Sequence, residues 1–115
     1  MILKNKKHIE KPWGFEEQLT LNEETTVKIL VANPGEELSY QTHEHRDEFW
    51  MVLSDEAVVV LNDEEKILKK NDTLEVFKGD KHQLKGGLKG STILEISTGG
   101  WDADDITRLK DKYNR

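Results

Sequence analysis

Turn-forming groups such as Asn33-Pro34-Gly35, Asn62-Asp63 and Gly86-Gly87 recur about every ten residues along the chain. Between the turns lie short segments rich in β-branched and aromatic residues, at 25–31, 38–43, 48–53, 57–61, 66–69, 73–77 and 92–97. No helix-length pattern separates these segments, which argues against the strand and helix alternation of βαβ folds. The spacing therefore predicts an all-β fold, either an antiparallel sandwich or a barrel.

One helix is expected, at the C-terminus. Asp102 is suited to capping its first turn, acidic residues follow it, and lysines lie where the last turn would be. Ile106, Leu109 and Tyr113 are spaced i, i+3 and i+7, so they would share one face of the helix. We expect this short amphipathic helix to pack on the outside of the barrel.

Length and composition limit the number of domains, the residues that could bind a metal and the kinds of partner. A chain of 115 residues is long enough for one hydrophobic core, and we expect residues 1–115 to form a single domain. The chain has no cysteine, so any metal must be held by His, Asp or Glu. Its 17 Lys and Arg against 23 Asp and Glu give a net charge of −6, which disfavours nucleic acid as a partner because phosphate backbones attract clustered basic residues.

The apolar runs are short. The segment 57–61 is far below the ~20 residues that cross a bilayer. The first ten residues also lack the apolar segment of a signal peptide. We therefore expect a cytoplasmic protein with no membrane partner.

The spacing of three histidines and a glutamate points to a metal site. His43 and His45 are two residues apart, so in a strand both would project from the same face. A short turn would then bring the Glu48 carboxylate beside them on the next strand. Two imidazoles and a carboxylate that converge form a facial site for a divalent metal. His82, at the start of a later strand, is the candidate for a fourth ligand.

These residues resemble the two sequence motifs of the cupin superfamily. The first motif is matched by Gly35, His43, Glu44, His45 and Glu48, and the second by Asn71, Asp72, Thr73, Phe77, Gly79 and His82. The resemblance implies a small jelly-roll barrel, the double-stranded β-helix of cupins. It also implies a metal ion held by His43, His45, Glu48 and His82.

A narrower resemblance, to the type II phosphomannose isomerase family, covers almost the whole chain. It is carried by KPWG at 11–14, LSYQ at 38–41, HEHRDEFW at 43–50, DDITRL at 104–109 and DKYNR at 111–115. In that family the barrel occurs alone or fused behind a mannose-1-phosphate guanylyltransferase domain. The resemblance implies a metal-dependent isomerase that interconverts mannose 6-phosphate and fructose 6-phosphate. One divalent ion (Zn, Mn, Co, Ni or Fe) and a homodimer are implied as well.

Three residues are expected to be catalytic. Glu95 matches a glutamate of the family in the strand 92–97 and would act as the general base, with a solvent-facing carboxylate as the alternative. Arg46 and Lys81 match cations of the family pattern and would assist the reaction. For Arg46, the alternative is an ion pair with Asp47 or another nearby acidic residue.

Four residues are expected to bind the sugar phosphate. Arg46, Lys28 and Arg108 match cations of the family pattern, and a guanidinium fork fits phosphate oxygens well. For Arg108, a surface salt bridge on the expected helix is the alternative. Gln41 lies two residues before His43, so in a strand the two side chains would face the same interior. There Gln41 would orient a sugar hydroxyl or, as the alternative, form a hydrogen bond with the barrel wall.

The chain departs from the family pattern at two positions of the expected pocket. Gln83 stands where the family has Arg, and Ser97 stands where it has Gln. Two other functions are also compatible with the sequence. One is a non-catalytic, metal-binding cupin that recognises a sugar or sugar phosphate. The other is a different metal enzyme, such as a non-haem iron oxygenase, because three histidines and a glutamate also suit iron.

Overall fold

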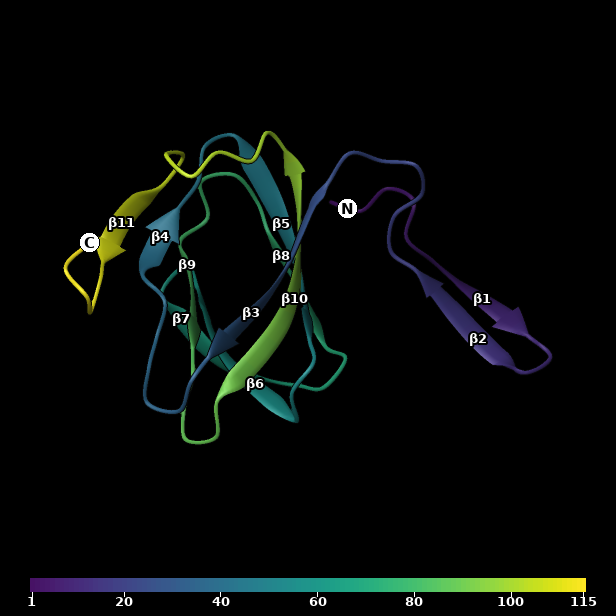
Figure 1. Ribbon diagram of the computed structural model, residues 1–115, viewed down its shortest axis with the longest axis horizontal. Helices are drawn as coiled ribbons and strands as arrows, with labels where there is room; N and C mark the ends of the chain where they lie inside the picture. The colour runs from purple at the N-terminus through teal and green to yellow at the C-terminus, as the bar shows by residue number, and fades with distance from the viewer.

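The computed structural model describes residues 1–115 as eleven β-strands with no helix, which confirms the all-β prediction (Figure 1). The strands are β1 (Lys7–Lys11), β2 (Gly14–Gln18), β3 (Thr26–Ala32), β4 (Tyr40–Thr42), β5 (Arg46–Val52), β6 (Glu56–Leu61), β7 (Glu64–Lys69), β8 (Thr73–Val76), β9 (His82–Lys85), β10 (Ser91–Gly99) and β11 (Thr107–Lys110). None of the segments forms an apolar helix of bilayer-spanning length.

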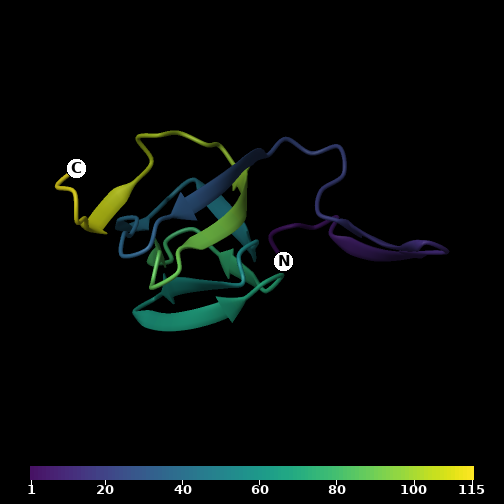
Figure 2. The same cartoon turned by 60° about the horizontal axis from the view of Figure 1, so that its bottom comes forward.

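Two antiparallel sheets face each other and enclose the interior (Figure 1, Figure 2). One sheet has the strand order β3-β10-β5-β8, and the other has the order β11-β4-β9-β6-β7. In the first sheet, β10 lies between β3 and β5, which pairs residues 91–97 with 26–32 and residues 93–99 with 46–52. Strands that are distant in sequence therefore lie side by side, as in the jelly-roll barrel expected from the motifs.

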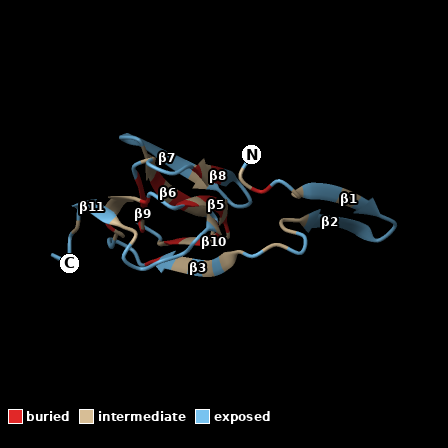
Figure 3. Ribbon diagram, turned by 90° about the horizontal axis from the view of Figure 1, so that it is seen from above, coloured by how far each residue is buried: buried red, intermediate tan, exposed pale blue.

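The interior has an apolar part and a polar part, and β10 contributes to both. Ile93 is fully buried in the apolar cluster, whereas Glu95 and Ser97, on the same face of the strand, are buried among polar groups. The apolar cluster consists of Ala32, Trp50, Val52, Ala57, Val59, Leu74, Val76, Leu84 and Ile93. Figure 3 shows that the buried segments lie mainly in the strands of the barrel and not in the β1–β2 hairpin. Nine of the 22 buried residues are polar or charged, so the interior needs a network of internal hydrogen bonds.

The expected C-terminal helix is not present, and this prediction is wrong. The Asp102 carboxylate does accept the backbone N–H of Asp104, but the chain turns instead of continuing as a helix. Residues 107–110 then form β11, which pairs antiparallel with β4. Pairing with this sheet edge satisfies backbone groups that a short helix would have satisfied internally, so tertiary structure outweighs the capping signals. Leu109, placed on the helix's apolar face by the sequence pattern, is 50% exposed.

A hairpin of β1 and β2 projects from the barrel and was not predicted from the sequence. Its strands pair only with each other, from Lys7 with Gln18 to Lys11 with Gly14. Pro12 and Trp13 form the turn, and Gly14 has a φ of +145° that favours glycine. The hairpin extends away from the two sheets and is almost wholly exposed (Figure 1, Figure 3).

The apolar cluster predicts a clear difference between two isoleucines. Replacing the fully buried Ile93 by Ala is expected to lower the free energy of unfolding by about 3 kcal/mol, because it leaves a cavity between the sheets. Ile67→Ala is the matched control, because Ile67 lies in β7 and is 60% exposed, and a loss of at most about 0.5 kcal/mol is expected. Urea denaturation followed by circular dichroism measures both. Equal losses would contradict the assignment of the core.

Candidate functional site

A pocket of about 280 Å³ is formed at the polar part of the interior. Both sheets and the loop between β10 and β11 contribute to its wall. The lining residues are Lys28, Leu30, Leu38, Ser39, Gln41, His43, Arg46, Glu48, Trp50, His82, Gln83, Leu84, Glu95, Trp101, Ala103, Ile106, Arg108 and Arg115. Most of the buried polar side chains of the molecule are therefore gathered around one cavity.

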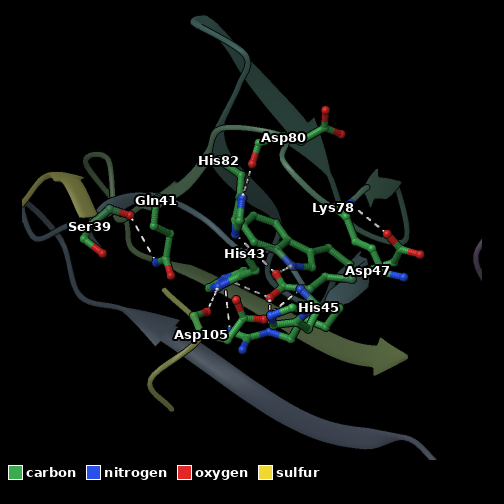
Figure 4. A network of polar contacts seen from close by, with 12 residues as sticks. Ser39, Gln41, His43, His45, Asp47, Lys78, Asp80, His82 and Asp105 are labelled. Atoms are coloured by element: carbon green, nitrogen blue, oxygen red, sulfur yellow. Dashed lines mark hydrogen bonds and ion pairs between the residues drawn. The ribbon is translucent and has the colours of Figure 1, made fainter. Parts of the chain in front are cut away.

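Three side chains in this pocket form a ligand set that can hold a metal ion. His43 directly follows β4, Glu48 lies in β5 and His82 is the first residue of β9. Their ligand atoms all lie within 4.8 Å of one another (Figure 4). Glu48 Oε2 is 3.3 Å from His43 Nε2, and Glu48 Oε1 is 3.5 Å from His82 Nε2. This juxtaposition supports three of the four ligands expected from the sequence.

The backbone orients both imidazoles for this purpose. His43 Nδ1 donates to the carbonyl oxygen of Asp105 at 2.6 Å, and His82 Nδ1 donates to the carbonyl oxygen of Asp80 at 2.9 Å. Because a carbonyl oxygen only accepts hydrogen bonds, the proton of each ring lies on Nδ1. The lone pair of each ring then lies on Nε2, on the side that faces Glu48. Carbonyl acceptors of this kind commonly fix the tautomer of metal-binding histidines.

Burial and neighbouring charges favour the protonation states that a metal requires. Burial lowers the pKa of His43, which favours the neutral ring. Burial would raise the pKa of Glu48, but His82, His43 and the Arg46 guanidinium together hold it below its usual value. The indole N–H of Trp50 also donates to Glu48 Oε1 at 3.1 Å. A neutral imidazole and an ionised carboxylate are both ready to bind a cation.

Arg46 is buried beside these ligands. Its Nε donates to Glu48 Oε2 at 3.0 Å, and its Nη2 donates to His43 Nε2 at 3.0 Å. The alternative expected from the sequence, an ion pair with a nearby acid, is therefore present, and its partner is Glu48. Asp47 instead accepts the backbone N–H of Lys78. The guanidinium occupies the lone pair that a metal would use on His43, so metal binding requires it to move.

His45 does not join the ligand set, in contrast to the expectation from the sequence. His43 and His45 would share a face only in a continuous strand, but β4 ends at Thr42 and β5 begins at Arg46. The alternation of side chains is lost in the bend between them. The backbone N–H of His45 donates to the Asp105 carboxylate, and its side chain is exposed.

Glu95 lies inside the pocket and not on the solvent-facing side of β10. It is 6% exposed, and burial followed by the nearby negative charge of Glu48 raises its pKa to about 8. The position agrees with the sequence analysis. Its expected role as a catalytic base stays a prediction.

Three of the four expected cations line the pocket, and the fourth does not. Lys28, Arg46 and Arg108 contribute to the wall. Lys81 lies outside it, where its Nζ is 3.5 Å from the exposed Asp63 carboxylate. Lys81 directly precedes His82, whose side chain points inward, so the neighbouring side chain points to the other face.

Neutral hydrogen-bonding groups complete the wall. Gln41 lines the pocket as expected, and its amide donates to the carbonyl oxygen of Ser39 at 3.2 Å. The Gln83 amide donates to the carbonyl oxygen of Leu38 at 2.8 Å. The hydroxyl oxygen of Ser39 is buried in this wall without any hydrogen-bond partner in the protein, so it is available to a ligand. The Ser97 hydroxyl is also buried and unpartnered, but Ser97 does not line the pocket, although the sequence led us to expect it to.

Two further pocket residues were missed from the sequence. Trp101 follows β10, and the Lys28 ammonium lies over its ring, 3.6 Å from the centroid. Arg115 also lines the pocket. Neither residue belongs to a local pattern that signals a site, because the loop between β10 and β11 and the C-terminal segment reach the pocket only through the fold.

Comparisons with known proteins identify the family and support the fold. A sequence model of the family described as "Mannose-6-phosphate isomerase C-terminal" matches residues 2–111. The chain belongs to this family. Among solved structures, a cupin protein from Bacteroides fragilis superimposes with a TM-score of 0.61 at 19% identity, over 76% of this chain and 80% of the other. The member described here therefore has the cupin fold.

The sequence relatives of this family member are named for a different activity from the one we expected. Mannose-1-phosphate guanylyltransferase ManC of Salmonella typhimurium is 33% identical over 111 residues, which is 95% of this chain and 23% of that protein. Mannose-1-phosphate guanylyltransferase 2 of Escherichia coli O157:H7 is 35% identical over 105 residues, which is 90% of this chain and 22% of that protein.

The chain therefore spans less than a quarter of these enzymes. They are named for guanylyl transfer to mannose 1-phosphate, which is not an aldose–ketose isomerisation. The prediction that this chain interconverts mannose 6-phosphate and fructose 6-phosphate is contradicted by these relatives and is wrong.

The ligand set of this cupin predicts which variants lose metal. His43→Ala, Glu48→Gln and His82→Ala are each expected to weaken Co²⁺ or Zn²⁺ binding by at least about 100-fold, because each removes one of three ligands. His45→Ala is the matched control and is expected to bind as the wild type does. Isothermal titration calorimetry measures all four variants. A loss for His45→Ala equal to that for His82→Ala would contradict the assignment.

The buried Glu95 predicts a pH dependence of stability in the metal-free protein. Its pKa is about 8 in the folded state against 4.5 as its ordinary value, so the folded state binds more protons between these pH values. Stability is therefore lost as pH rises through this window, by up to about 1.4 kcal/mol per pH unit. Glu95→Gln removes this contribution.

Urea denaturation of chelator-treated protein at pH 5.5 and pH 7.5 tests the sign. The wild type is expected to lose about 2 kcal/mol more than Glu95→Gln between these two pH values. Glu64→Gln, a change on the exposed surface of β7, is the control and should follow the wild type. A larger loss for Glu95→Gln than for the wild type would show that the sign is wrong.

Proposed function

We propose that this chain is a metal-binding cupin domain that binds a phosphorylated mannose. One observation carries the proposal: the His43, Glu48 and His82 ligand set shares its pocket with four cationic side chains. The four cations are Lys28, Arg46, Arg108 and Arg115.

The balance of charge supports an anionic ligand. The chain as a whole has a net charge of −6, yet this pocket gathers four cations against two carboxylates, Glu48 and Glu95. Lys28 and Arg108 form no ion pair with any acidic residue of the chain. Cations that are held in a pocket without an acidic partner suit the oxygens of a phosphate group.

The uncharged residues of the pocket wall support a sugar as the rest of the ligand. The unpartnered Ser39 hydroxyl and the Gln41 amide can bond to sugar hydroxyls, and Trp101 supplies an aromatic ring. The pocket volume of about 280 Å³ lies just below the lower limit of about 300 Å³ for typical ligand pockets. A single sugar ring with one phosphate is favoured over a nucleotide sugar by this size.

A divalent ion held by His43, Glu48 and His82 would supply a Lewis acid for the oxygen atoms of the sugar. The donor set suits Zn, Mn, Co, Ni or Fe and does not select among them. Arg46 provides a link between metal and phosphate. When it leaves His43, its guanidinium becomes available to an anion in the same pocket.

The relatives indicate which ligand to test first. Those named above are mannose-1-phosphate guanylyltransferases, so mannose 1-phosphate is the first choice. We expect the metal-loaded chain to bind mannose 1-phosphate and not mannose, because mannose offers no charge to the four cations. Isothermal titration calorimetry with both sugars measures this difference.

Variants of two lysines make the test specific. Lys28→Gln is expected to weaken binding of mannose 1-phosphate about tenfold, because it removes an unpaired cation of the pocket. Lys81→Gln is the matched control, because Lys81 precedes a metal ligand but lies outside the pocket, and no change is expected. Equal affinity for mannose and mannose 1-phosphate would overturn the proposal.

A further inference from the structure

The Arg46 guanidinium uses the same atoms that a metal ion would use. Its Nη2 donates to His43 Nε2 at 3.0 Å, and its Nε donates to Glu48 Oε2 at 3.0 Å. Both acceptor residues belong to the set that can hold a metal. The unprotonated nitrogen of an imidazole has a single lone pair, which either accepts a hydrogen bond or binds a metal. Arg46 and a metal ion therefore exclude each other at His43.

The guanidinium also compensates the charge that a metal would compensate. Glu48 is 2% exposed and Arg46 is 7% exposed, and their side chains form an ion pair. A buried carboxylate that loses such a partner is strongly destabilised. Arg46 thus stands in for a metal cation beside Glu48. When an ion binds, Glu48 keeps a positive partner, and the buried guanidinium is the group that needs a new acceptor.

The released guanidinium would lie close to another cation of the pocket. Arg46 Cζ is 5.3 Å from the centroid of the Trp101 ring, and the Lys28 ammonium is 3.6 Å from the same centroid. These two distances place the cationic groups at most about 9 Å apart. A tetrahedral oxyanion that accepts one hydrogen bond from each side spans roughly 8 Å, so it fits between them.

Arg46 has N–H groups to spare for such an anion. Of its five N–H groups, one donates to Glu48, one to His43 and one to the carbonyl oxygen of Asp102, and the other two have no acceptor in the protein. Release from His43 frees the second N–H of Nη2. An edge of a guanidinium with two free N–H groups binds two oxygens of a phosphate or sulfate group.

We infer that a metal ion and a phosphate-type oxyanion bind this pocket cooperatively, with Arg46 as the residue that couples them. The ion takes His43 and Glu48 from Arg46, and the anion takes the released guanidinium. Each ligand therefore lowers the cost of binding the other, and the coupling is reciprocal by thermodynamic linkage. The inference rests on the proposed function in one respect, which is the anionic character of the ligand.

Titration of Co²⁺ into chelator-treated wild-type protein tests the coupling without any variant. Sulfate is the first anion probe, because it has the tetrahedral oxygens of a phosphate group and forms only a weak complex with Co²⁺. Isothermal titration calorimetry compares Co²⁺ affinity with and without sulfate at one ionic strength, set with sodium chloride. Sulfate is expected to tighten Co²⁺ binding about tenfold, within the usual range of coupling between sites. Competition of sulfate for free Co²⁺ has the opposite sign, so unchanged or weaker binding would overturn the inference.

Arg46→Gln tests the residue itself. Without an anion, this variant is expected to bind Co²⁺ about tenfold more tightly than the wild type, because no guanidinium has to leave His43, and sulfate should then give no further gain. Lys81→Gln is the charge-matched control, because Lys81 directly precedes the ligand His82 but lies outside the pocket, and it should behave as the wild type does. Circular dichroism establishes that each variant is folded, and the wild-type titration decides alone if Arg46→Gln is not. Weaker Co²⁺ binding by Arg46→Gln, or a sulfate effect that persists in it, contradicts the role of Arg46.

Mannose 1-phosphate in place of sulfate separates this inference from the proposed function. If sulfate tightens Co²⁺ binding but mannose 1-phosphate does not bind, the sugar ligand is wrong and the coupling stands. If mannose 1-phosphate binds equally to Co²⁺-loaded and chelator-treated protein, the coupling is wrong and the sugar ligand stands. The second result is also the one expected if Glu95, the other carboxylate of the pocket, accepts the released guanidinium.

Discussion

A carboxylate that is 2% exposed inside a small barrel must be compensated, because an isolated buried charge costs several kcal/mol. Glu48 receives this compensation from the indole N–H of Trp50 and from the guanidinium of Arg46, which both lie on β5 with it. The Nε2 atoms of His43 and His82 lie 3.3 and 3.5 Å from its oxygens and come from the bend after β4 and from β9 of the other sheet. The rest of the pocket is arranged around this one charge, and the same arrangement makes the carboxylate a metal ligand.

The jelly roll supplies the place for such a charge because it separates the two parts of its interior. β10 continues from the apolar cluster at Ile93 into the polar pocket at Glu95 without a change of face. The apolar part provides the stability and the polar part remains open to a ligand. Two of the three ligands, Glu48 and His82, lie on paired strands, which fixes their backbone positions.

Much of this could be predicted from the sequence, because strand periodicity and turn spacing are local signals. These signals correctly predicted the all-β fold and the convergence of Glu48 and His82 in one site. The failures have a common cause: they depend on where a strand ends or which strand it pairs with. His45 was misplaced because β4 ends before it, and the C-terminal helix was wrong because β4 offers an edge for pairing. Trp101 reaches the pocket only through tertiary structure. The reaction was mispredicted because the motifs specify a barrel and a ligand set, and they leave the chemistry undetermined.

Asp105 provides no ligand atom in this arrangement, yet its carbonyl oxygen holds His43 and its carboxylate binds the backbone of the bend that follows. The part of the chain that orients the first ligand is thus 62 residues later in the sequence. The orientation of His43 therefore depends on whether the segment between β10 and β11 is docked on the barrel. Local opening of this segment would release the His43 ring while leaving Glu48 and His82 in place on their paired strands, so affinity for a metal ion would be coupled to the docking of a segment that contributes no ligand atom.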